Sequence, residues 1–395
     1  MPAAGRILLT RGLRGFADGL VSVLLAGHLA RLGFSSLQIG AIVAGTLLGS
    51  ALLTTAVGLF SHRLDPRRVL LASSALMLAT GLGFGALASF WPIFVVAVVG
   101  TLNPSAGDVS VFLPTEQALL AQANAAERPA LFARYNVSGS IAGAFGALAS
   151  AGPALLSTRI GIDVATAERM AFLLYALVGL ASAVAYAGLP AAVQPASPTS
   201  HRPLAQSRRI VLQLAALFSL DSFGGGFVVQ TLLVLWLSRR FGLPVETMGT
   251  VFFAAGILSA LSQLLSPRIA ARIGLVRTMV YTHLPANLFL VLAGVVPSAP
   301  LAIGFLLARA LLSQMDVPVR QAYVMAVVPP EERAAAAGVT NVPRSLAAVL
   351  PPFFTGLMLD RSTFGWPLVC AGVLKAVYDL LLLAQFHSVP PLDEA

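Results

Sequence analysis

A small set of charged residues lies inside long apolar segments of this sequence. If those segments cross a membrane, each Arg or Asp at the bilayer centre costs about 2.5–3.5 kcal/mol, so each should face a cavity or a partner. We therefore take these residues as candidates for binding a polar solute or a proton. They are Arg11, Arg14, Asp18, Asp108, Glu116, Asp221, Arg309, Asp316 and Arg320.

Helical spacing arranges part of this set in two stripes, because residues three, four or seven apart share a helix face. Arg11, Arg14 and Asp18 form one stripe, and Arg309, Asp316 and Arg320 form the other. Within each stripe an arginine can neutralise the aspartate. A structural ion pair and a substrate-binding role are therefore both open. For Arg14 and Asp18, a hydrated position near the membrane surface is a further alternative.

Asp108 and Glu116 are acidic residues with no basic residue nearby in the same segment. They must find partners elsewhere or take up protons. A carboxyl group that gains and loses a proton as a cavity opens and closes can couple a proton gradient to transport. Both are thus candidates for coupling or substrate binding, and the alternative is a static bridge to Arg320 or to the first apolar segment.

Asp221 precedes the sequence Ser-Phe-Gly-Gly-Gly at 222–226, which has poor helix propensity. Two interpretations are open: a broken helix that exposes backbone to a substrate, or close helix packing through small residues. Farther along the chain, Lys375 and Asp379 are four residues apart and are expected to pair. His28 and His283 stand alone, which favours buried hydrogen bonding over a metal or proton role.

The composition identifies the elements that must position these residues. Hydrophobic residues make up 57% of the 395 residues and charged residues only 10%, whereas soluble domains carry about a quarter charged residues. Continuous apolar runs of about 20 residues indicate membrane-spanning helices, since barrel strands would alternate over about ten residues. The net charge of +9 comes from arginines between the apolar runs and not from a basic face, which argues against nucleic acid as a partner. The single cysteine, Cys370, excludes an intrachain disulfide and a cysteine metal cluster.

Apolar runs and turn residues predict an all-α membrane protein with about twelve spans. The polar stretch 191–208 is rich in Pro, Ser and Ala and divides the chain into six-helix halves at 1–190 and 209–395. The loop arginines place both termini and this linker on the cytoplasmic side, and nothing resembles a cleavable signal peptide. The predicted spans are 9–31, 37–60, 69–90, 92–121, 132–156, 168–190, 210–238, 246–265, 276–296, 299–327, 336–359 and 365–387.

The two halves resemble each other, as expected for a transporter built from repeats. A shift of 209 residues sets Arg31 and Gly33 on Arg240 and Gly242, and a shift of 204 sets Glu116 on Arg320. Chance matches of Ala and Leu are common in such a composition, but ordered matches of Arg, Gly, Pro and Gln are less so. We therefore interpret the sequence as an internal repeat.

The loop after the second span carries a recognisable motif. It reads GLFSHRLDPRR at 58–68, and its counterpart reads PRIAARIGLVR at 267–277. The motif is similar to the cytoplasmic signature of the major facilitator superfamily, although His62-Arg63 stands where that family has an aspartate. The resemblance implies two six-helix bundles that rock about a central site, with spans 1, 4, 7 and 10 around the cavity. It also implies that charged residues of these loops form a latch between cytoplasmic helix ends, which controls the opening of the transporter. The alternative is that the loop arginines only fix the orientation of the protein in the membrane. The residues are Arg63, Asp65, Arg67, Arg68, Arg268, Arg272 and Arg277.

The sequence thus predicts a secondary active transporter of a small organic solute in the bacterial inner membrane. Proton-coupled efflux by antiport is preferred over uptake by proton symport or facilitated diffusion, although Gly139, Gly143 and Gly146 depart in spacing from the drug-antiporter motif that they resemble. No nucleotide-binding loop or hydrolase motif appears, so we expect no enzyme activity, cofactor or metal. The sequence leaves three further functions open: a membrane enzyme, a lipid-handling protein and a non-transporting sensor. The expected partners are a small-molecule substrate, protons and the lipid bilayer, with the protein as a monomer.

Overall fold

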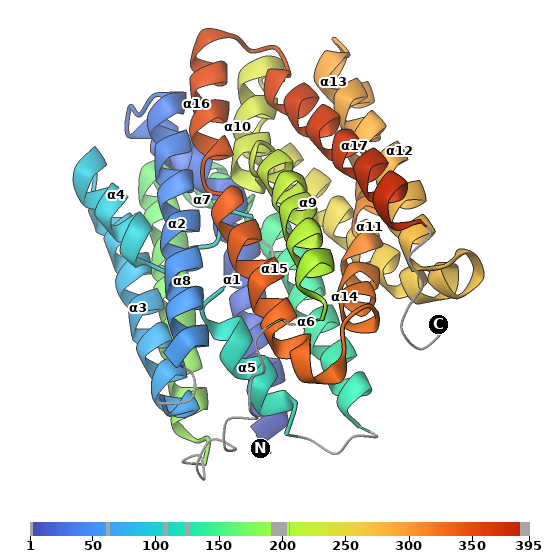
Figure 1. The fold of residues 1–395 in the computed structure, drawn as a ribbon. Helices are drawn as coiled ribbons and strands as arrows, with labels where there is room; N and C mark the ends of the chain where they lie inside the picture. Colours follow the sequence, from blue (N-terminus) through green and yellow to red (C-terminus); the bar gives the residue numbers. More distant parts are fainter. Residues whose placement is uncertain are drawn as a thin grey trace. The chain divides into compact units, whose positions relative to one another are not determined.

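The structure is a computed structural model that describes residues 3–60, 64–105, 110–122, 127–190, 204 and 206–387, and this part of the chain is helical without strands (Figure 1). Two compact units make up the fold. The first comprises Met1–Ser197 and Val229–Gly256, and the second comprises Pro198–Val228 and Ile257–Ala395. The predicted halves 1–190 and 209–395 stay a prediction. Most of the predicted linker, 191–203 and 205, lies outside the described residues.

The first unit holds the helices from the first part of the chain together with two that come later. These are α1 (Ala3–Arg31), α2 (Ser36–Phe60), α3 (Pro66–Ala86), α4 (Phe90–Val99), α5 (Phe112–Leu120), α6 (Arg128–Ala149), α7 (Gly152–Ile160), α8 (Val164–Ala187), α10 (Gln230–Phe241) and the beginning of α11 (Val245–Ile273). Helix α1 lies against α6, α8 and α10, so its charged stripe is surrounded by protein.

The second unit holds the remaining helices. These are α9 (Arg208–Gly226), the rest of α11, α12 (Leu275–Val295), α13 (Ala299–Ser313), α14 (Asp316–Ala326), the 3-10 turn Pro330–Glu332, α15 (Arg333–Ala347), α16 (Pro351–Arg361) and α17 (Trp366–Phe386). Helix α9 begins at Arg208 because the buried Glu332 carboxylate accepts hydrogen bonds from the backbone N–H groups of Gln206 (3.0 Å) and Ser207 (3.1 Å). These bonds satisfy donors that a helix N-terminus leaves free.

Eleven of the twelve predicted spans correspond to a segment that could cross a membrane, although several of these segments contain a short break between two helices. Eleven segments of the described chain are long and apolar enough to cross a membrane. The predicted span 92–121 is wrong as a continuous helix, because α4 ends at Val99 and α5 begins at Phe112. Pro104 disfavours the helical conformation at Asn103. The Asn103 side chain also accepts hydrogen bonds from the backbone N–H (3.1 Å) and the hydroxyl (2.7 Å) of Ser105, which stabilises a turn.

A second interruption separates α9 from α10 at 227–229, directly after the three glycines that suggested a break. Packing through small residues is present as well, since a Cβ on Gly226 would lie 2.7 Å from the Ala348 carbonyl oxygen. Both interpretations of this segment are therefore confirmed as far as backbone structure goes. Contact of this backbone with a substrate stays a prediction.

Residues of other helices donate hydrogen bonds to backbone carbonyl groups where the fourth span is interrupted. They are Thr231 at the beginning of α10 and Tyr175 on α8. The Thr231 N–H and hydroxyl donate to the Pro104 carbonyl oxygen at 3.1 and 3.0 Å, and the hydroxyl also donates to the Ser22 carbonyl oxygen at 2.8 Å. The Tyr175 hydroxyl donates to the Thr101 carbonyl oxygen at 3.0 Å. Non-helical backbone is tolerated at membrane depth only with such partners or beside water.

Glycines bring α1 and α6 into backbone contact. A Cβ on Gly19 would overlap the Gly143 carbonyl oxygen, and a Cβ on Gly146 would overlap the Phe16 carbonyl oxygen. Small residues at a helix interface allow such an approach in membranes. The glycines of α6 that resemble an antiporter motif therefore pack this helix against α1.

We predict that Gly19→Val destabilises the protein, because the added side chain must displace the backbone of α6. Overpacking of a tight site costs about 1–3 kcal/mol or more. Thermal unfolding in detergent measures the effect. Gly12→Ala on the same helix is the control: a Cβ there meets nothing within 4 Å, so stability should stay equal or rise by up to about 1 kcal/mol. Equal unfolding temperatures for both variants would contradict the proposed contact.

Candidate functional site

In the first unit, the Glu116 carboxylate on α5 is fully buried and accepts hydrogen bonds from three other helices. Its Oε1 accepts from the Tyr186 hydroxyl (2.5 Å) and the Thr10 hydroxyl (3.2 Å). Its Oε2 accepts from the Tyr135 hydroxyl (2.6 Å) and forms an ion pair with Arg14. Each oxygen thus accepts two hydrogen bonds, an arrangement that suits a carboxylate, which only accepts. Glu116 joins α5 to α1, α6 and α8.

Arg14 contacts Glu116 and not the aspartate on its own helix. The expectation that an arginine of this stripe neutralises Asp18 through an ion pair is therefore wrong for the described structure. The Arg14 guanidinium also lies over the Phe112 ring, 4.0 Å from its centroid. Both contacts come from α5. The partners of Arg14 are therefore residues of a neighbouring helix, and not Asp18, which lies one turn away on α1.

Asp18 is left as an open acceptor. Its side chain is 9% exposed, and no hydrogen bond or ion pair reaches it from the described residues. Arg14 and Arg11 attract it electrostatically from one and two turns earlier on α1. It lies near the middle of α1 (Ala3–Arg31) and is buried. A hydrated position near the membrane surface stays an alternative. Asp108 lies outside the described residues.

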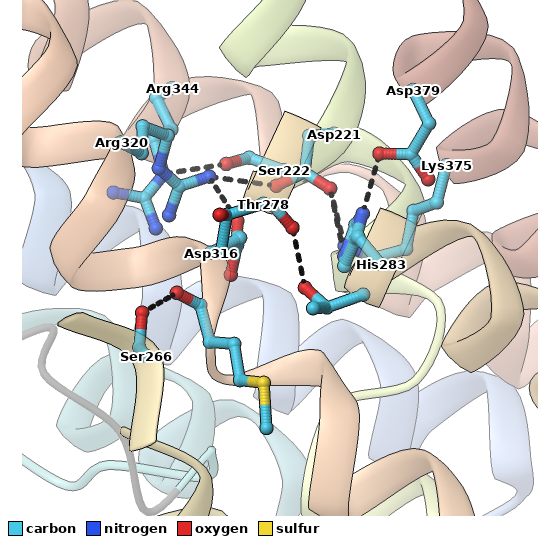
Figure 2. A network of polar contacts seen from close by, with 12 residues as sticks. Asp221, Ser222, Ser266, Thr278, His283, Asp316, Arg320, Arg344, Lys375 and Asp379 are labelled. Atoms are coloured by element: carbon cyan, nitrogen blue, oxygen red, sulfur yellow. Dashed lines mark hydrogen bonds and ion pairs between the residues drawn. The ribbon is translucent and has the colours of Figure 1, made fainter. Parts of the chain in front are cut away.

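In the second unit, Asp221 on α9 is the centre of a buried charge network (Figure 2). Its Oδ1 lies 2.6 Å from the Lys375 ammonium, and its Oδ2 lies 3.1 Å from a guanidinium nitrogen of Arg320. The same Arg320 nitrogen lies 3.4 Å from an Asp316 oxygen. The predicted pairing of Asp316 with Arg320 is confirmed. The alternative of a bridge from Glu116 to Arg320 stays a prediction.

The expected pair of Lys375 with Asp379 is wrong. Lys375 reaches Asp221, and the Asp379 carboxylate instead contacts His283 Nδ1 (2.9 Å) and the Asn287 amide (2.7 Å). Glycines on α9 make this possible, because a Cβ on Gly224 would lie 3.0 Å from the Lys375 side chain. Lys375 therefore passes close to the α9 backbone on its way to Asp221.

Arg309 on α13 is one of several buried donors in the described part of the second unit that have no hydrogen-bond partner. Its buried Nε has no hydrogen-bond partner in the described part of the chain. The stripe that placed Arg309 with Asp316 and Arg320 is interrupted, since α13 ends at Ser313 and α14 begins at Asp316. Arg309 thus lies on another helix than Asp316, whose arginine partner is Arg320. A nearby arginine, Arg344, is engaged, because its Nε donates to the Ser222 hydroxyl at 3.0 Å.

Two further observations concern residues that the sequence did not single out. Glu168 on α8 is buried and lies 3.3 Å from His28 Nδ1 and 2.9 Å from Arg31 Nε, which confirms buried hydrogen bonding for His28. The hydroxyls of Tyr135 and Tyr186 surround Glu116. An acid at the beginning of an apolar span was a usable signal for Glu168, whereas a tyrosine in such a span is too common to be one.

The loop of the signature motif makes local contacts in the first unit. Asp65 caps α3 by accepting from the Arg67 backbone N–H at 3.0 Å. The Arg67 guanidinium donates to the Ala187 carbonyl oxygen at the end of α8 (2.6 Å), where positive charge is favourable. Arg68 lies 3.8 Å from Asp65. In the second unit Arg268, Arg272 and Arg277 are exposed, and Arg63 lies outside the described residues. The latch itself stays a prediction.

The model of the Major Facilitator Superfamily matches residues 7–313 and 214–394. The chain belongs to this superfamily. It is therefore a membrane transporter and not an enzyme, and the predicted all-α fold of this superfamily is confirmed.

Several known proteins are similar to this member of the superfamily. An uncharacterized membrane protein of Saccharomyces cerevisiae is 26% identical, and the match covers 95% of this chain and 92% of the relative. The nucleoside transporter NupG is 14% identical with a TM-score of 0.72, covering 98% of this chain and 99% of that one. A D-xylose–proton symporter is 16% identical with a TM-score of 0.72, covering 98% of each chain. The two solved structures show the fold alone.

We predict that Glu116→Gln destabilises this transporter, because it leaves the Arg14 charge buried without its counterion. Breaking a buried pair from one side costs about 3–5 kcal/mol. The double variant Arg14→Met/Glu116→Gln should recover most of this loss. Denaturant unfolding of the single and double variants gives the coupling energy, and additive effects would contradict a direct pair. Tyr186→Phe is the control, with a loss of about 1.5–3 kcal/mol for one hydrogen bond to a charged group.

Proposed function

We propose that this superfamily member is a secondary active transporter that carries a small polar organic solute by alternating access and is driven by the proton gradient. The observation that carries the proposal is Asp18, a buried acid near the middle of α1 that accepts no hydrogen bond within the described chain. An unpaired carboxylate in an apolar interior is costly. The cost is removed when an ammonium or hydroxyl group of the solute donates to it.

Arg309 supports the same interpretation independently in the second unit. A guanidinium that has no hydrogen-bond partner in the described residues can donate to a carbonyl, phosphate or carboxylate oxygen of a solute. The remaining candidates, Glu116, Asp221, Asp316 and Arg320, are engaged with protein partners. We therefore assign solute binding to Asp18 and Arg309, and a positioning role to the engaged residues.

Export by proton antiport is the direction that we propose, with the protein as a monomer in the bacterial inner membrane and both termini in the cytoplasm. The signature-loop arginines would act as a latch between cytoplasmic helix ends. Proton symport is the second candidate, because a D-xylose–proton symporter has the same fold. Nucleosides and D-xylose, the solutes named for the two similar structures, are the first members of the test panel.

We predict that Asp18→Asn reduces solute transport in proteoliposomes by about tenfold or more, because the amide replaces the charged acceptor for the solute. Solute counterflow without a pH gradient and proton-driven accumulation should fall together, since both need binding. Transport equal to that of the unmodified protein would contradict the assignment. Glu116→Gln is measured in parallel, and proton-driven accumulation that persists there would show that Glu116 is not the coupling acid.

The direction is tested with imposed pH gradients of opposite sign. In antiport, solute accumulates in vesicles with an acidic interior, because protons leave as solute enters. In symport, it accumulates in vesicles with an alkaline interior. We expect accumulation with the acidic interior. Accumulation with the alkaline interior would establish symport instead, and flux without accumulation under either gradient would establish facilitated diffusion.

A further inference from the structure

His283 lies between two carboxylates in the second unit. Its Nδ1 lies 2.9 Å from an Asp379 oxygen on α17, and its Nε2 lies 3.8 Å from an Asp221 oxygen on α9 (Figure 2). All three side chains are buried. A neutral imidazole can donate from only one nitrogen, whereas an imidazolium donates from both. A protonated ring faces a carboxylate on each side, and only the Asp379 oxygen lies at hydrogen-bond distance; the Asn287 amide nitrogen also lies 3.2 Å from Nδ1.

The charges of the contacting groups also call for a proton. The set consists of three carboxylates, Asp221, Asp316 and Asp379, and two cations, Arg320 and Lys375. The two cations form ion pairs with Asp221 and Asp316, whereas Asp379 contacts His283. A net charge in a buried cluster is costly. One proton on His283 makes this set of groups neutral, and its departure leaves the set with one negative charge.

The other groups around His283 define how firmly that proton is held. Helix α12 packs against α13, α14 and α17. From α17, Tyr378 presents its ring edge to the imidazole, with centroids 6.0 Å apart. Asn287, one turn away on α12, donates to Asp379 at 2.7 Å and fixes its orientation. Arg309 on α13 and Arg344 on α15 add positive charge without a direct ion pair to the three acids. Their charge has the same sign as that of an imidazolium.

We propose that His283 and Asp379 form the proton-binding site of this transporter, and that its proton leaves through Asp221. The bond between Nε2 and its hydrogen breaks as an O–H bond forms on Asp221, and the imidazole becomes neutral. The present 3.8 Å separation is too long for that transfer, which needs about 2.6–3.2 Å. Proton release thus requires α9 and α12 to approach each other. This inference rests on proton coupling in the proposed function and adds residues outside the predicted cavity spans.

The first test measures the proton itself on purified protein without solute. Ring-labelled histidine NMR should show a protonated imidazole that is lost in His283→Gln and becomes neutral in Asp379→Asn, where the remaining carboxylates and cations already balance. A pH jump should release one proton fewer from His283→Gln. Unchanged proton release from His283→Gln, or a ring that is neutral at all pH values, would overturn the site.

The second test separates coupling from solute binding. His283→Gln and Asp379→Asn should keep counterflow within about twofold and reduce proton-driven accumulation by about tenfold or more, as expected for loss of a proton-transfer group. His28→Gln is the matched control, because His28 is also buried beside an acid, Glu168, and should keep both activities. Normal proton-driven accumulation in His283→Gln would overturn the proposal, as would loss of counterflow in both variants. If the unmodified protein carries no solute, the proposed function fails while the NMR test still reports on the proton.

Discussion

The structure depends on one constraint: a charged side chain in an apolar interior must have its charge and hydrogen bonds satisfied. In the first unit this constraint ties α5 to three helices, because the partners of Glu116 come from α1, α6 and α8. In the second unit it ties α9 to α14 and α17 through Asp221. The polar contacts therefore join specific helices, in addition to the close packing through small residues seen between α1 and α6.

The sequence predicts the spans well, because hydropathy is a property of continuous segments. It does not predict the interruption between Val99 and Phe112, since apolar residues continue through it. That break exists because distant residues satisfy its backbone, among them Thr231, which donates to Pro104. Such a contact joins positions far apart in the chain and has no periodicity that a reader of the sequence could detect.

Partners of the buried charges are predictable only within one helix. The spacing rule holds for Asp316 with Arg320 because both lie on α14. It fails for Arg14 and for Lys375, which turn to Glu116 and Asp221 on other helices. In both cases a neighbouring helix offers a carboxylate at closer range than the aspartate one turn away. The tyrosine hydroxyls at Glu116 and the amide of Asn287 give no sequence signal at all, since isolated polar residues of these types are common in spans.

The two units meet the same constraint with different chemistry, and the difference separates their roles. Glu116 is surrounded by hydroxyls and an arginine, groups that keep their charge at any physiological pH. The network of Asp221 includes a histidine, His283, to which we assign the exchanging proton. The described polar cluster around Glu116 can therefore act as a fixed scaffold beside the open acceptor Asp18. In the proposal, the network around His283 changes by one charge during a cycle, so the proposed proton site lies in the second unit.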